Sequence, residues 1–186
     1  MTSPIREKLP NYCKMKIFLI GLSGSGKTTL GKELCEEQGI KFIDLDQEIE
    51  KKEGTSVGEI FSRKGEEVFR QVEADTLRSL ANEQNDFLMA TGGGAPCFYD
   101  SMTFINEQGV SVFLDVSPER LVERLQSKGL DERPLLNTYS DEELLEKIKH
   151  LRSLRMPVYK QSALRITEDN ITSSLLWKAL QPFLKS

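Results

Sequence analysis

One eight-residue segment, Gly21–Thr28, constrains the fold of this chain more than any other feature. It reads Gly-Leu-Ser-Gly-Ser-Gly-Lys-Thr, follows an apolar run at Met15–Ile20 and precedes a helical pattern over Thr28–Gln38. A glycine-rich turn of this spacing, between a strand and a helix, directs backbone N–H groups and a helix N-terminus at phosphate oxygens. The segment therefore predicts an α/β fold that binds the phosphate chain of a nucleotide.

The side chains of this phosphate loop have expected partners. The Lys27 ammonium can neutralise the β- and γ-phosphates, and the Thr28 hydroxyl can bind Mg²⁺. The alternative, a glycine-rich turn without a ligand, leaves the position of Lys27 unexplained. The residues expected to bind ATP in this region are Gly21, Ser23, Gly24, Ser25, Gly26, Lys27, Thr28 and Thr29.

Short apolar runs alternate with helical patterns along the rest of the chain. This alternation is typical of βαβ units and predicts a parallel sheet covered by helices on both faces. A final helix is predicted at Ser173–Leu184. The predicted strands are Met15–Ile20, Lys41–Leu45, Phe87–Ala90, Val110–Val116 and Ala163–Ile166.

Two intervals are longer than a simple crossover between strands requires. Residues 47–85 are predicted to form three helices, with breaks at Gly54, Gly58 and Gly65, and to make up a substrate-binding insert. Residues 127–140 form a second insert, which is predicted to be a mobile lid.

Length and charge limit the domain count and the classes of partner. The 186 residues carry 25 basic and 29 acidic side chains, a net charge of −4, which argues against nonspecific nucleic-acid binding. No apolar run approaches the length of a membrane-spanning helix. We expect a single domain over residues 15–186, preceded by a polar N-terminal extension at residues 1–14. The expected partners are small molecules, with no nucleic acid, no membrane and no second subunit.

Cysteine and histidine are scarce. The three cysteines, Cys13, Cys35 and Cys97, contain no Cys-x-x-Cys pair. They argue against a disulfide framework or a zinc site and favour a reducing, cytoplasmic location. The single histidine, His150, lies in a charged helical stretch and is expected to be solvated.

Two carboxylates lie at the end of the second predicted strand. Alternation along a strand places Asp44 and Asp46 on one face, at the edge where parallel sheets bind ligands. One of them can hold Mg²⁺ through water, and the other can orient a hydroxyl that attacks the γ-phosphate. The alternative for Asp46 is the N-cap of the next helix. Asp115, at the end of the fourth strand, competes as a metal ligand.

Three consecutive glycines and several arginines complete the candidate site. The segment Thr91-Gly92-Gly93-Gly94 directly follows a strand, which indicates a ligand against bare backbone; the alternative is a plain tight turn. The arginines that can bind anionic oxygens are Arg70, which Glu73 can brace, Arg133 in the proposed lid, and Arg152 and Arg155 on one helical face. Each of them, taken alone, is more often a solvated surface residue.

Taken together, these elements resemble the shikimate kinase family over nearly the whole chain from Met15. The resemblance rests on six segments in order: Gly21–Thr28, Asp44-Leu-Asp46, Gly65-Glu-Glu-Val-Phe-Arg70, Gly92-Gly-Gly94, Arg133-Pro-Leu-Leu136 and Arg155-Met-Pro-Val-Tyr159. It implies a three-layer α/β/α P-loop kinase with a five-stranded parallel sheet of order 2-3-1-4-5. The implied reaction transfers the ATP γ-phosphoryl group to the 3-hydroxyl of shikimate, in the chorismate route to aromatic amino acids.

The resemblance also implies a role for each candidate residue. Asp46 would bind shikimate and act as base or orienting group, and Asp44 would join Thr28 around Mg²⁺, which leaves Asp115 without a metal role. Lys27 and Arg133 would act in catalysis with Asp46. Shikimate would be bound by Asp46, Arg70, Gly92, Gly93, Gly94 and Arg155, and ATP by the phosphate loop together with Arg124 and Arg133. Arg152 receives no role and is expected to be solvated.

Other functions stay open at this point. A gluconate or nucleotide kinase would share the phosphate loop and the arginines. A non-catalytic ATP-binding module would share the loop, but it would have no need for the carboxylate of Asp46. A GTPase is disfavoured because the chain has no Asn-Lys-x-Asp motif.

Overall fold

The computed structural model describes residues 15–83, 86–127 and 140–184. The predicted N-terminal extension and Cys13 lie outside the described residues. So do residues 128–139 of the predicted lid, with Arg133. Among the described helices, none has the length and apolar character needed to cross a membrane.

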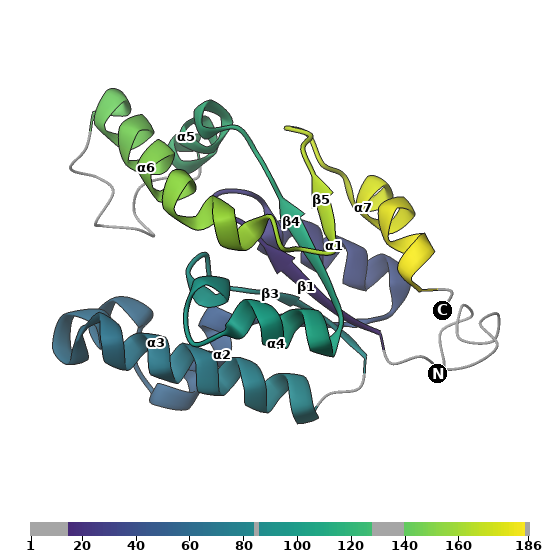
Figure 1. Ribbon diagram of the computed structural model, residues 1–186, viewed down its shortest axis with the longest axis horizontal. Helices are drawn as coiled ribbons and strands as arrows, with labels where there is room; N and C mark the ends of the chain where they lie inside the picture. Colours follow the sequence, from purple (N-terminus) through teal and green to yellow (C-terminus); the bar gives the residue numbers. More distant parts are fainter. Residues whose placement is uncertain (1–14, 84–85, 128–139, 185–186) are drawn as a thin grey trace.

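The sheet has the predicted strands and the predicted order. Five parallel strands are arranged as β2-β3-β1-β4-β5, which confirms the α/β class (Figure 1). Each strand ends within two residues of its predicted bounds. The strands are β1 (Lys16–Ile20), β2 (Lys41–Asp44), β3 (Phe87–Ala90), β4 (Val110–Leu114) and β5 (Leu164–Ile166).

Helices cover both faces of this sheet. Helices α1 and α7 pack together on one side, and α4 lies on the other with α3 beside it (Figure 1). The helices are α1 (Lys27–Gln38), α2 (Leu45–Glu53), α3 (Val57–Glu83), α4 (Ser101–Gln108), α5 (Pro118–Ser127), α6 (Asp141–Tyr159) and α7 (Ser173–Leu180), with 3₁₀ turns at Ala95–Cys97 and Gln181–Phe183. The last helix ends earlier than predicted because Pro182 lies in a 3₁₀ turn.

The central strand shows why the strands of the sheet could be predicted from the sequence. β1 lies between β3 and β4, and Ile17, Phe18, Leu19 and Ile20 are all fully buried. A strand covered on both faces needs apolar side chains at every position, so it reads as one continuous run.

The long interval before β3 forms three helical segments, as predicted, but not with all the predicted breaks. Gly54 ends α2 at φ 68°, and Gly65, at φ 83° and ψ 169°, divides α3 into two parts. Gly58 does not interrupt α3, because it lies in the first turn, just after the Ser56 cap. There the Glu59 N–H donates to Ser56 Oγ over 3.2 Å.

Candidate active site

The phosphate loop joins β1 to α1 in a conformation that requires glycine. Gly24 and Gly26 have φ of 85° and 97°, and Gly26 is the N-cap of α1. A Cβ at Gly21 would lie 2.9 Å from the Leu114 carbonyl oxygen. The spacing that identified the loop in the sequence is therefore the spacing of positions where the backbone tolerates no side chain.

The Lys27 ammonium is held against this loop. Its Nζ donates to the carbonyl oxygens of Gly21 over 2.8 Å and of Leu22 over 3.0 Å, and the residue is buried. The charge is therefore concentrated at the N-terminus of α1, where the helix dipole also favours an anion.

Asp44 and Asp46 occupy different positions from those expected of one strand face. β2 ends at Asp44 and α2 begins at Leu45, so Asp46 lies in the first helical turn. The N-cap is Asp44, whose Oδ1 accepts from the Gln47 N–H over 3.4 Å. The alternation argument and the N-cap alternative for Asp46 were both wrong, because the cap is Asp44, which ends the strand one residue before its predicted end at Leu45.

Thr28 and Asp44 are brought together at the start of α1. The Thr28 hydroxyl donates to Asp44 Oδ2 over 2.8 Å, and both residues are half-buried. Two oxygen donors are a common protein contribution to a Mg²⁺ site, because this ion keeps several waters and binds substrate phosphates. The described residues contain no cluster of three or more His, Cys, Asp or Glu side chains suited to a metal.

Arg70 is a buried cation that forms ion pairs with two glutamates of its own helix. Its Nη1 donates to Glu73 Oε2 over 2.7 Å, and its Nε and Nη2 both lie 3.2 Å from Glu66 Oε1. The brace from Glu73 was predicted, and the contact from Glu66 was not. Burial raises the pKa of Glu73, against the opposing effect of Arg70.

Aromatic rings surround the Arg70 guanidinium. The carbon at its centre, Cζ, lies 4.5 Å from the centroid of the Phe98 ring, 5.1 Å from that of Phe69 and 5.5 Å from that of Phe61. Such contacts favour a fixed cation. The sequence left the role of Phe98 open between shaping the substrate pocket and packing, because only the fold brings the segment after the glycines onto α3.

The three glycines leave room for the site's own side chains. A Cβ at Gly92 would lie 2.5 Å from Glu73 Oε1 and 2.9 Å from Asp46 Oδ1. One at Gly94 would lie 2.4 Å from Arg70 Nη1, and one at Gly93 would lie 3.1 Å from Arg155 Nη1. Side chains from α2, α3 and α6 thus converge on the loop after β3, which explains why these three positions need glycine.

The position of Gly93 places this convergence beside the phosphate loop. A Cβ at Gly93 would lie 3.5 Å from the Gly21 carbonyl oxygen and 3.7 Å from the Ser23 N atom. The Gly93 carbonyl accepts a hydrogen bond from the hydroxyl of Tyr159, which is fully buried near the end of α6. Burial raises the pKa of Tyr159, so its hydroxyl stays a donor.

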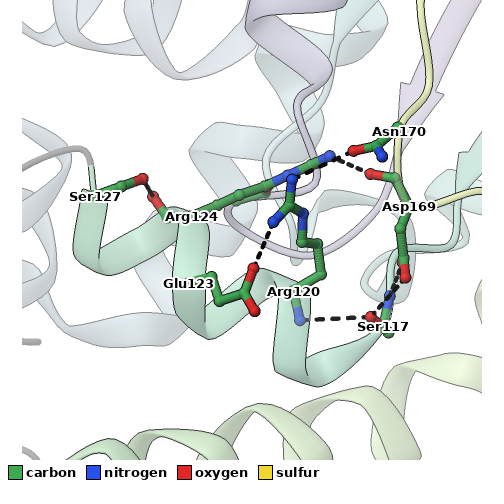
Figure 2. Close-up of polar contacts among 8 residues, drawn as sticks. Ser117, Arg120, Glu123, Arg124, Ser127, Asp169 and Asn170 are labelled. Atoms are coloured by element: carbon green, nitrogen blue, oxygen red, sulfur yellow. Dashed lines mark hydrogen bonds and ion pairs between the residues drawn. The ribbon is translucent and has the colours of Figure 1, made fainter.

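Arg124 bridges the phosphate loop and the segment after β5. Figure 2 shows its guanidinium reaching the Asp169 carbonyl, to which Nη2 donates; Nη1 donates to the Ser25 carbonyl over 3.3 Å. The same segment is tied to the start of α5, where the Ser117 N–H donates to Asp169 Oδ1 over 3.0 Å (Figure 2). Arg124, which is expected to lie against adenine, therefore contacts the phosphate loop.

Asp115 is fully engaged by two arginines. Its Oδ1 lies 2.8 Å from Arg152 Nη2, and its Oδ2 lies 3.0 Å from Arg165 Nε and 2.5 Å from Arg165 Nη2. Its side chain is only 4% exposed. This arrangement agrees with the loss of the metal role, and it corrects the expectation that Arg152 is solvated. His150 is exposed, as predicted.

Comparison with known proteins identifies the family. The shikimate kinase family model matches residues 23–183. A shikimate kinase from Bacteroides fragilis is 46% identical over 148 residues, covering 80% of this chain and 82% of the relative. One from Parabacteroides distasonis is 44% identical over 156 residues, covering 84% and 89%.

Solved structures agree in fold and sequence. The shikimate kinase from Bacteroides thetaiotaomicron superposes with a TM-score of 0.82 at 39% identity, covering 90% of this chain and 95% of the other. That from Acinetobacter baumannii, in complex with shikimate, gives 0.80 at 33% identity, covering 97% and 96%. A gluconokinase from Sinorhizobium meliloti, at 0.56 and 17%, shares the fold alone. The chain belongs to the shikimate kinase family.

Proposed function

We propose that this chain transfers the γ-phosphoryl group of ATP to the 3-hydroxyl of shikimate, giving shikimate 3-phosphate and ADP. The observation that carries the proposal is the convergence of Asp46, Arg70 and Arg155 on Gly92–Gly94. A Cβ added at Gly93 of this loop would lie within 4 Å of backbone atoms of the phosphate loop. A carboxylate group and a ring hydroxyl of one small acceptor would meet two cations and one anion there.

The two arginines are assigned to the acceptor carboxylate. A guanidinium pairs with a carboxylate through two parallel hydrogen bonds, which fixes the orientation of the acid as well as its position. Arg70 is held in place by Glu73 and Glu66, so little side-chain entropy remains to be lost on binding. Arg155 approaches the same loop from α6.

Asp46 is assigned to the acceptor hydroxyl. Its carboxylate lies beside Gly92, and its residue is exposed, whereas the neighbouring Glu73 is buried and committed to Arg70. An accessible carboxylate can accept the proton of an attacking hydroxyl or orient it. The backbone of Gly92, Gly93 and Gly94 completes the acceptor subsite.

The nucleotide is assigned to the loop at the start of α1. Backbone N–H groups of this loop and the Lys27 ammonium would bind the phosphate chain, and Arg124 would lie against adenine. Lys27 would also stabilise charge in the transition state, together with Arg133 of the predicted lid at residues 127–140. The lid would exclude water, which protects ATP from hydrolysis.

Mg²⁺ is proposed to bind at Thr28 and Asp44. Their 2.8 Å contact places a hydroxyl and a carboxylate oxygen next to Lys27. The ion would neutralise phosphate charge when bound with ATP. Asp44 would orient Thr28 through the hydrogen bond that joins them.

The remaining assignments concern organisation and location. We assign residues 47–85 as the substrate-binding insert of a single domain over residues 15–186, because Arg70 and Glu73 come from this interval. We also propose a cytoplasmic monomer. The free thiols of Cys35 and Cys97, in the described part of the chain, fit a reducing compartment.

The test is ADP release from MgATP with separate acceptors: shikimate, gluconate and a panel of nucleoside monophosphates. We expect strong stimulation by shikimate alone. Stimulation by gluconate or a nucleotide would overturn the acceptor assignment, and ATP binding without stimulation by any acceptor would indicate a non-catalytic module. Within a positive result, Arg70→Ala should raise the shikimate KM about 10- to 150-fold, since it removes a charge-assisted hydrogen-bonding partner.

A further inference from the structure

The ion cluster of Asp115, Arg152 and Arg165 has no role in the chemistry described above. Its carboxylate lies directly after β4, and its two cations come from α6 and β5. A small pocket lined by Asp115 and Arg152 is also lined by Leu22 of the phosphate loop and Leu121 of α5. The pair therefore lies where α6 meets the nucleotide-binding part of the fold.

Helix α6 is the element that carries Arg155 to the acceptor site. Arg152 precedes Arg155 by three residues, so the two side chains leave the helix on neighbouring positions of one face. Arg152 pairs with the end of β4, and Arg155 reaches Gly93. A rotation or shift of α6 would move both guanidinium groups together.

The energetics of the cluster favour a positioning role over a stabilising one. Arg152 Nε is buried and has no hydrogen-bond partner within the residues that the structure describes. An unsatisfied buried donor costs stability, and an ion pair whose arginine side chain is 31% exposed contributes little stability in return. What such a pair provides is a defined geometry between two elements.

We propose that Asp115 and Arg152 are positioning residues, which fix α6 relative to the phosphate loop and thereby set the place of Arg155 in the acceptor site. The proposal rests on the proposed function, because it concerns the distance between the two substrates. It adds that the affinity for the acceptor depends on an ion pair that touches neither substrate. Arg165 binds the same carboxylate from β5, and none of the side chains assigned to the acceptor site comes from β5.

This difference supplies a matched pair of variants. Arg152→Gln removes the link from Asp115 to α6, and Arg165→Gln removes the link to β5. In each variant the buried carboxylate keeps one arginine, so both proteins should fold. We expect Arg152→Gln to raise the shikimate KM about 5- to 100-fold, the range for a substrate-binding side chain, here Arg155, that is misplaced by roughly 1 Å. The ATP KM should change less than about twofold, and Arg165→Gln should leave both values within the same limit.

Two further measurements separate positioning from general loss of structure. Arg152→Lys keeps a cation near Asp115, so its shikimate KM should lie between that of Arg152→Gln and that of the native protein. Hydrogen exchange of the α6 backbone around residues 148–156 should increase in Arg152→Gln and not in Arg165→Gln. Equal shikimate KM values in Arg152→Gln and the native protein would overturn the proposal, and so would equal effects of the two glutamine variants.

Failure of the proposed function would be recognised separately. In that case the native protein itself would show no shikimate-dependent ADP release. The exchange comparison still tests the link, since it needs no acceptor. Unchanged exchange in α6 of Arg152→Gln would then refute the positioning role.

Discussion

A single methyl group at Gly94 should displace Arg70 without unfolding the protein. Gly94 has φ −92° and ψ −24°, values that alanine adopts freely, so Gly94→Ala introduces no backbone strain. The added Cβ would lie 2.4 Å from Arg70 Nη1 and 2.6 Å from Cζ and Nη2. Because ordinary contact begins near 3.4 Å, the guanidinium must move away by about 1 Å.

The size of the effect follows from what Arg70 would lose. Its hydrogen bond to Glu73 is 2.7 Å long and does not survive such a movement. A misplaced guanidinium forfeits a charge-assisted hydrogen bond to the acceptor, about 1.5–3 kcal/mol, which corresponds to a KM increase of about 10- to 150-fold. Overpacking of the buried site should lower the unfolding free energy by about 1–3 kcal/mol.

The assay is ADP release at saturating ATP over a range of shikimate, with thermal unfolding followed by circular dichroism. Gly58→Ala is the matched control: the nearest atom to its new Cβ is Ser56 Oγ, at 4.0 Å. That variant should keep the native KM and gain about 0.5–1 kcal/mol of stability, because glycine is a poor helix former. A native shikimate KM in Gly94→Ala would refute the argument, as would an equal rise in the ATP KM.

Three other outcomes are expected. Lys27→Met should reduce turnover by at least about 100-fold while the protein stays folded, because the loop loses its buried cation; kcat above a tenth of native would contradict this. Burial raises the pKa of Glu73 above its ordinary value, so its contribution to stability is present at low pH and lost as pH rises through the raised pKa. Denaturant titrations should therefore show the native protein losing stability relative to Glu73→Gln as pH rises above the ordinary pKa of a glutamate, and parallel curves would exclude this. Burial raises the pKa of Cys35 to about 12, so its thiol should resist alkylation at about pH 8 until the protein unfolds, as followed by peptide mass spectrometry; rapid labelling of the native protein would be inconsistent with this.

Most of the fold, and the phosphate loop, could be predicted from local patterns in the sequence. The β1 strand was predictable because both of its faces are buried, and the phosphate loop because its glycines, Gly21, Gly24 and Gly26, occupy backbone positions with positive φ. The Glu73 brace was predictable from helical spacing, since it lies three residues from Arg70.

The errors arose where two local preferences compete or where contacts span the chain. Asp44 could extend a strand or cap a helix, and the cap prevails, which turns Asp46 into a helical residue. Arg152 looks solvated in a charged helix, because its partner Asp115 is 37 positions away in the sequence. The Phe98 contact with Arg70 likewise depends on the packing of the segment after β3 against α3.

The most direct test of the proposed function is the position of the phosphate in the product. The protein would be incubated with MgATP and shikimate, and the product examined by phosphorus–proton correlation NMR. The proposed function predicts coupling between phosphorus and the proton on C3 alone. Phosphate on another hydroxyl, or release of inorganic phosphate in place of a phosphorylated acceptor, would contradict the account.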